Sequence, residues 1–290
     1  MKRTRLTIAV ITSLALLAGC SSSTSSSTDS AAVGSSMDSS MDPKMDPKMD
    51  HSSMPAPSLA PGMATAAPGG GSFLNEKLPA DVLALPLFDS TGEAFTLADF
   101  AGKYVVITNF LTSCHEICPM TTVNMRDIAR ALSAVGLASK VAVMEVSVDG
   151  ERDTAPRLAA YQALFNEKSW IMAGGSTQSL AALWKYFGAP AKKEVFSAAD
   201  MATLPKDWQT GKSDTYDMMH SDLVIILGPD STWRWLDLGS PKTSQGDIPA
   251  ALKAYLTEDG QKNLAAPEEP TWSVGAVLAA ITQLTLNPVK

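Results

Sequence analysis

The stretch that decides the fold runs from Tyr104 to Met120 and reads YVVITNFLTSCHEICPM. Its first seven residues, Tyr104–Phe110, are apolar almost throughout, as expected of a strand that is buried on both faces. Pro119 suits the first position of a helix, where its missing N–H is no loss. Apolar residues at helical spacing then continue from Met120 to Val135. The stretch therefore predicts a buried strand, a short loop with two cysteines, and a helix.

Strand and helix patterns alternate on both sides of this stretch. We predict hairpins at Val82–Leu97 and Asp222–Leu236, strands at Lys140–Val148 and Trp170–Ala173, and helices at Thr154–Phe165, Leu180–Phe187 and Ile248–Leu256. This order predicts an α/β domain at residues 73–264, with a mixed sheet flanked by helices in the thioredoxin-like arrangement. Residues 190–213 show no clear periodicity and are expected to form a surface excursion.

The first residues have the pattern of a secretion signal. Lys2, Arg3 and Arg5 precede the short apolar run Leu6–Leu17, which is too brief to span a bilayer as a helix. The run closes with Leu-Ala-Gly-Cys20, which resembles the bacterial lipobox. We therefore expect residues 1–19 to be a lipoprotein signal peptide and Cys20 to carry the lipid. That places the protein outside the cytoplasm, anchored to a bacterial cell membrane.

The net negative charge argues against nucleic acid as a partner and against electrostatic binding to a membrane. The chain carries a formal charge of −7, and the predicted signal peptide contains three of its cations and no acid. Nucleic acid is therefore an unsuitable partner, since phosphate binding needs a basic face. Electrostatic attachment to a membrane is equally disfavoured, so the lipid has to hold the protein there.

Residues 20–72 are rich in Ser, Pro, Ala and Gly and are expected to form a disordered tether. A repeat within it, Met41-Asp-Pro-Lys, Met45-Asp-Pro-Lys, Met49-Asp-His51, presents thioethers, which are soft ligands for Cu(I). A weak copper-collecting arm and low-complexity drift explain this repeat equally well. The C-terminal tail, residues 265–290, contains the apolar stretch Trp272–Leu286, which is expected to pack on the domain or on a partner.

Two cysteines, Cys114 and Cys118, remain once Cys20 is assigned to the lipid. Residues four apart on a helical turn lie close enough for a disulfide or for two sulfurs on one metal ion. We expect the positive end of the helix dipole to stabilise their thiolates. Two cysteines alone cannot enclose zinc, whereas two thiolates and one imidazole suit copper. A structural disulfide of an exported protein fits the same pair.

Two histidines of the domain are candidate imidazole ligands. His115 lies between the cysteines, but its side chain is expected to point away from their shared face, either exposed or behind the ligands. His220 stands directly before the apolar strand that begins at Asp222, and a neighbouring strand could bring it to the sulfurs. A structural role fits His220 as well.

Three segments together resemble the Sco/SenC family. They are Asn109–Pro119 with its Cys-x-x-x-Cys-Pro motif, Val146–Thr154, and His220 before a hairpin. The resemblance covers most of residues 80–257. It implies a thioredoxin-like domain that holds Cu(I) or Cu(II) through Cys114, Cys118 and His220. It also implies a metallochaperone that delivers copper to the copper site of a cytochrome c oxidase subunit, with a redox-linked cysteine pair and a thiol reductant as a further partner.

An enzyme is the rival interpretation, and a copper or redox sensor is a third. A thiol-disulfide oxidoreductase would use the redox pair Cys114 and Cys118 without metal, as a reductant of oxidase cysteines or as a thiol peroxidase. Reductases usually have two residues between their cysteines. A peroxidase needs a Pro, Thr and Arg setting, and no arginine lies near Thr112 in sequence. Asp149 follows a buried strand, where an aspartate is usually a helix-start or turn residue, although its position also suits a functional role.

Overall fold

The computed structural model describes residues 65–243 and 247–286. All of these residues belong to one compact unit of the chain. The predicted signal peptide, Cys20, the methionine repeat and most of the predicted tether lie outside the described residues and stay predictions.

The strands of the described residues are β1 (Thr65–Ala66), β2 (Ser72–Lys77), β3 (Leu87–Asp89), β4 (Ala94–Phe95), β5 (Tyr104–Phe110), β6 (Val141–Ser147), β7 (Ile171–Gly175), β8 (Lys192–Val195), β9 (Tyr216–Met219), β10 (Leu223–Leu227), β11 (Thr232–Leu238), β12 (Ser240–Pro241) and β13 (Thr271–Trp272). The helices are α1 (Ala80–Leu83), α2 (Cys118–Ala134), α3 (Ala155–Ala163), α4 (Thr177–Tyr186), α5 (Ala198–Thr203), α6 (Ala250–Tyr255), α7 (Glu258–Ala265) and α8 (Val274–Leu286), with a 3-10 turn at Leu97–Phe100.

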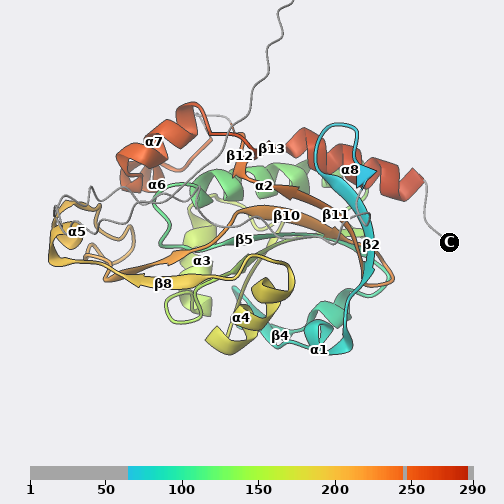
Figure 1. Cartoon of the computed structure of the whole chain (residues 1–290), viewed down its shortest axis with the longest axis horizontal. Coiled ribbons are helices and arrows are strands. Elements are labelled where there is room, and N and C mark those ends of the chain that lie inside the picture. The colour runs from blue at the N-terminus through green and yellow to red at the C-terminus, as the bar shows by residue number, and fades with distance from the viewer. Residues whose placement is uncertain (1–64, 244–246, 287–290) are drawn as a thin grey trace, which may run out of the picture. The chain divides into compact units, whose positions relative to one another are not determined.

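The main sheet of the described residues has nine strands in the order β1-β2-β11-β10-β5-β6-β7-β3-β4. Its centre, β5-β6-β7, is parallel, and the strands on both sides are antiparallel. Helices α2 and α8 lie on one side of this sheet, and α1 and α4 on the other (Figure 1). The order β11-β10-β5-β6, with α2 between the parallel pair, is the thioredoxin-like arrangement. The predicted fold class, a mixed α/β sheet flanked by helices, is confirmed.

The core lies around β5 and β10. Every residue of β10 is buried, as are six of the seven residues of β5. Strands with partners on both edges and helices over both faces have no solvent side, so their sequences are apolar almost throughout rather than alternating. This explains why β5 could be placed to the residue from its sequence.

The predicted first hairpin is correct only in part. The hairpin at Val82–Leu97 requires a first strand that starts at Val82, but α1 occupies Ala80–Leu83 and β3 begins only at Leu87. Pro86 stands directly before β3 and has no N–H for a ladder bond, so the strand cannot extend back through it.

The sheet starts earlier than the predicted domain boundary. Residues 65–72, expected to be the end of the tether, contain β1 and the first residue of β2, and β2 pairs with β11. Gly71, between these strands, has φ +69°, and a Cβ there would lie 2.6 Å from the Trp235 ring. A glycine is therefore required in the turn between β1 and β2.

The predicted excursion has structure of its own. Strand β8 pairs with β9 in a small antiparallel sheet, and α5 follows β8. The segment between α5 and β9, residues 204–215, contacts the loop that carries Cys114, as described below. Towards the C-terminus, α8 packs against α2. The apolar tail was expected to pack either on the domain or on a partner, and the contact with α2 agrees with the first alternative. No helix among the described residues is both long and apolar enough to span a membrane.

Candidate metal centre

The two cysteines lie together at the N-terminus of α2, as predicted. Helix α2 begins at Cys118, one residue earlier than expected, so Pro119 is its second residue rather than its first. The Cys114 sulfur accepts hydrogen bonds from the backbone N–H groups of Ile117 and Cys118, each at 3.3 Å. The loop that precedes α2, residues 111–117, is called the cysteine loop below.

Both cysteines are free thiols, and they differ in exposure. Cys114 is partly exposed, whereas Cys118 is 1 % exposed and its sulfur accepts from the N–H of Leu111 at 3.4 Å. Burial, followed by the neighbouring Cys114 thiol and the Asp222 carboxylate, raises the pKa of the Cys118 thiol well above its ordinary value. Desolvation therefore outweighs the stabilisation of the Cys118 thiolate that was expected from the helix dipole.

His220 lies between β9 and β10 and is 7 % exposed. Because β10 pairs with β5, its first residues lie beside the end of β5 from which the cysteine loop departs. Asp222, two residues on, is near enough to act on the Cys118 thiol. The imidazole Nδ1 is 3.0 Å from the amide nitrogen of Asn109, on β5. The fold therefore brings His220 to the same end of the sheet as the cysteines.

The three predicted ligands are not assembled into a metal cluster in this conformation. Within residues 65–243 and 247–286, no group of three or more His, Cys, Asp or Glu side chains is arranged to hold a metal ion. The cysteines lie together, and the imidazole is bonded to Asn109 instead. The ligand set of Cys114, Cys118 and His220 therefore stays a prediction.

His115 is buried, which contradicts the expectation that it could be exposed. It is 3 % exposed, and its ring packs edge-on against Tyr255 with centroids 5.9 Å apart. Its Nδ1 has no hydrogen-bond partner among the described residues. Its carbonyl accepts from the N–H of Thr257, and a Cβ on Gly260 would lie 2.4 Å from that carbonyl oxygen. The His115 side chain therefore packs against the end of α6, and its backbone carbonyl contacts the start of α7.

Arg157, on α3, holds the start of the cysteine loop and was not identified from sequence. Its guanidinium donates to the hydroxyls of Thr112, at 2.5 Å, and Ser113, at 3.0 Å. The same group pairs with Asp207 of the excursion, and Trp208 donates its indole N–H to the Thr112 carbonyl at 2.8 Å. An arginine does therefore lie at Thr112, although none is near it in sequence.

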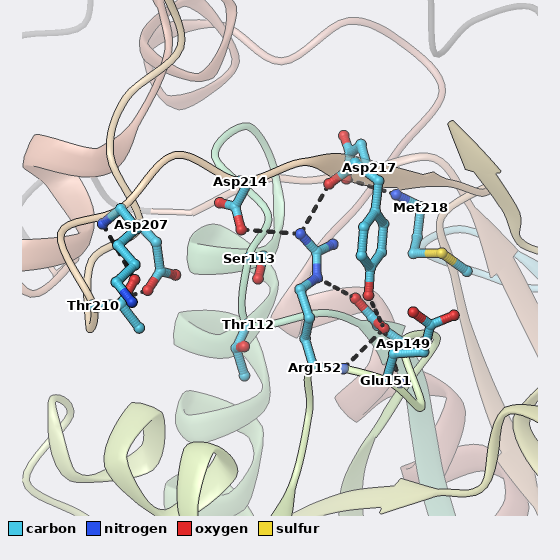
Figure 2. Close-up of polar contacts among 12 residues, drawn as sticks. Thr112, Ser113, Asp149, Glu151, Arg152, Asp207, Thr210, Asp214, Asp217 and Met218 are labelled. Carbon is cyan, nitrogen blue, oxygen red and sulfur yellow. Dashed lines mark hydrogen bonds and ion pairs between the residues drawn. The ribbon is translucent and has the colours of Figure 1, made fainter. Parts of the chain in front are cut away.

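A second arginine joins the end of β6 to the segment that leads to His220. Arg152 pairs with Asp149 and with Asp214, and it donates to the Tyr216 carbonyl at 2.9 Å (Figure 2). Asp149 also accepts from the N–H groups of Glu151 and Arg152, which confirms its interpretation as a turn residue. No sequence pattern distinguishes Arg152 or Arg157 from a solvated arginine, because only the fold buries them.

Tyr255, at the end of α6, completes the contacts of the cysteine loop. Its hydroxyl lies 2.9 Å from the Ser113 carbonyl and 2.7 Å from the Asp214 carboxylate. Contacts from α3, the excursion, α6 and α7 thus fix the backbone of the loop. The cysteines therefore sit on a rigid platform rather than on a loose loop.

Comparison with known proteins identifies a family. The sequence model of the SCO1/SenC family matches residues 84–257. The mitochondrial SCO1 homolog of Homo sapiens is 23 % identical over 168 residues, which are 57 % of this chain and 50 % of that protein. This chain spans about half the length of the mitochondrial relatives that it matches.

Two solved structures are also similar. The copper-bound structure of ScoI from Bradyrhizobium japonicum is 26 % identical, with a TM-score of 0.44 over 59 % of this chain and 97 % of that one. BsSco, described as a member of the Sco family of cytochrome c oxidase assembly proteins, is 21 % identical, with a TM-score of 0.39 over 53 % of this chain and 80 % of that one. The family match covers more than half of the sequence and includes all three predicted ligands. The chain belongs to the SCO1/SenC family.

Proposed function

We propose that this protein binds copper and delivers it to the copper site of a cytochrome c oxidase subunit. The observation that carries the proposal is the pair of free thiols, Cys114 and Cys118, at the start of α2 in an SCO1/SenC domain. His220 lies at the same end of the β5–β10 pair as the two cysteines, and we propose it as the third ligand.

The donor set fits copper in either oxidation state. Two sulfurs and one imidazole are soft and borderline ligands, which suit Cu(I) and Cu(II) better than hard cations. Deprotonation of the buried Cys118 thiol accompanies binding, since the metal ligand is the thiolate. Copper binding therefore releases protons.

Thiol redox chemistry would control retention of the metal. Exchange with a partner disulfide converts the two thiols into a Cys114–Cys118 disulfide and reduces the partner to two thiols. The disulfide removes two of the three ligands, so only the reduced protein retains copper. A thiol reductant is therefore a required partner.

The attachment to the membrane is proposed from sequence. Cys20 would carry a lipid that holds the protein outside the cytoplasm at the membrane of a bacterial cell, where an oxidase subunit is accessible. The stretch between Cys20 and the sheet would give the domain its reach.

Copper titration of the reduced full-length chain tests the proposal. One tightly held copper per chain is expected, with a sulfur-to-Cu(II) charge-transfer band that disappears in Cys114→Ala and Cys118→Ala. His220→Ala should weaken binding sharply at unchanged circular dichroism, while His115→Ala, the other histidine of the domain, serves as the matched control. Fully reduced protein that retains no copper would contradict the proposal.

A thiol-disulfide oxidoreductase is the second candidate. The observation in its favour is the unequal exposure of the pair, with a partly exposed Cys114 able to attack and a buried Cys118 able to resolve the mixed disulfide. Insulin reduction or peroxide turnover by the metal-free protein would support this candidate. A copper or redox sensor would share all three residues and is distinguished by the absence of copper transfer to an oxidase subunit.

A further inference from the structure

Asn109 lies on β5 beside the first residues of β10, and it is 1 % exposed. Its amide nitrogen donates to the Ser221 carbonyl at 2.7 Å, and its amide oxygen accepts from the N–H of Leu223 at 3.3 Å. A carbonyl only accepts and a backbone N–H only donates. The backbone therefore fixes which end of the amide is nitrogen and which is oxygen.

This orientation determines the tautomer of His220. The imidazole Nδ1 is 3.0 Å from the Asn109 amide nitrogen, which can only donate. Nδ1 must then be the nitrogen without a proton, so a neutral ring carries its proton on Nε2. In this form Nδ1 is occupied by the amide and Nε2 by its own hydrogen.

Ligation through Nε2, the ring nitrogen that does not face Asn109, needs the opposite tautomer. A histidine that binds metal through one nitrogen donates the N–H of the other to a carbonyl or carboxylate. Two such acceptors already stand beside Nδ1, namely the Ser221 carbonyl at 3.3 Å and an Asp222 carboxylate oxygen at 3.8 Å. The surroundings of Nδ1 thus contain one donor that favours the metal-free form and two acceptors suited to the metal-bound form.

We propose that Asn109 is a positioning residue that holds metal-free His220 in the tautomer that cannot bind metal through Nε2. Binding then moves the proton from Nε2 to Nδ1 through solvent, so the number of protons on the imidazole ring is unchanged while the thiols lose theirs. The Asn109–Nδ1 bond is lost, and Ser221 and Asp222 accept the new N–H. The inference rests on the proposed function, in which His220 ligates copper, and it makes release easier by stabilising the metal-free state.

Nitrogen-15 NMR of the neutral imidazole tests the first half without any metal. The wild-type, metal-free protein should show His220 with Nε2 protonated and Nδ1 bare, and Asn109→Ala should shift the ring toward the Nδ1-protonated form. Asn124→Ala is the matched control, because Asn124 is equally buried on α2. It should leave the tautomer unchanged. A wild-type ring protonated on Nδ1 would overturn the proposal.

Competition for Cu(I) with a chelator tests the second half. Asn109→Ala should bind copper roughly two- to tenfold more tightly, the factor that corresponds to one lost competing hydrogen bond. In a His220→Ala background the same substitution should change nothing, which separates an effect through the ring from an effect on packing. Affinity that is unchanged or weaker in folded Asn109→Ala overturns this proposal alone, whereas wild-type protein that retains no copper overturns it together with the proposed function.

Discussion

At the scale of single residues, Glu145 is an acid enclosed in the core beneath the cysteine-bearing helix. It lies on β6 and is fully buried, with one carboxyl oxygen 2.7 Å from the Trp170 indole nitrogen and the other 2.9 Å from the Thr122 hydroxyl. Burial raises the pKa of this carboxyl to about 8, although both hydrogen bonds act in the opposite direction. The carboxyl is therefore mostly protonated at pH 7, and its ionisation makes the free energy of unfolding depend on pH.

Glu145→Gln should flatten the pH dependence of stability. The folded carboxyl has a pKa of about 8 and the unfolded one about 4.5, so between these values the folded state binds more protons. Wild-type free energy of unfolding should therefore fall as pH rises through this window, by at most about 1.4 kcal/mol per pH unit. Urea unfolding at pH 5, 6, 7 and 8 measures the difference between the two proteins, and parallel curves would contradict the assignment.

Arg157→Met should destabilise the protein and loosen the cysteine loop. It leaves the buried Asp207 carboxylate without its ion pair, at a cost of about 3 kcal/mol, and removes the donors to Thr112 and Ser113. Copper should bind more weakly because the platform of the cysteines moves. The double variant with Asp207→Asn should regain most of the stability but not the copper affinity, as measured by urea unfolding and chelator competition. Recovery of both would show that the ion pair, not the loop contacts, governs binding.

At the scale of elements, α8 shows how the apolar tail is used. Its buried residues are spaced as one face of a helix: Ala276, Val277, Ala280, Ile281 and Leu284. This face packs on α2, and Tyr104 of β5 donates its hydroxyl to the Leu284 carbonyl at 2.8 Å. The tail therefore supports the helix that begins with Cys118.

Ile281→Ala should cost about 2–4 kcal/mol of unfolding free energy, since it removes a side chain that is 1 % exposed. Thr282→Ala, on the exposed side of the same turn, should change stability by less than about 0.5 kcal/mol. Urea unfolding of the two variants measures the contrast. Equal stability of the two would mean that α8 is not part of the cooperative fold.

Prediction from sequence worked best for elements enclosed on all sides. The limits of β5 were correct, because a strand between two partners and under two layers of helices is apolar almost from end to end. It failed at residues 82–85, where a short helix precedes Pro86, and in the excursion, whose strand β8 has three exposed or half-exposed polar residues and no periodic pattern. Edge elements bury little, so their sequences carry little signal.

At the scale of the whole molecule, the compartment is the property most open to test. Cys20→Ser should release the protein from the membrane fraction, because the acidic chain has no electrostatic attraction to anionic lipid. Fractionation of cells that express each form, followed by mass analysis of the N-terminus, measures the effect. Membrane retention of the serine variant at high salt would contradict a lipid on Cys20.

The sequence by itself determined the two thiols at the start of a helix and the apolar strand before them, because these depend on residues adjacent along the chain. It also determined the family, because that depends on residue types at fixed positions and not on which of them meet. The tertiary structure alone decided that Arg157 meets Thr112 and that Asn109 meets His220, partners 45 and 111 residues apart. It also raised the pKa of Cys118 where the helix dipole predicted the reverse. The physical reason is that burial and hydrogen-bond partners arise from contacts between segments that are distant in sequence. The sequence does not distinguish a polar residue that is exposed to solvent from one that is buried.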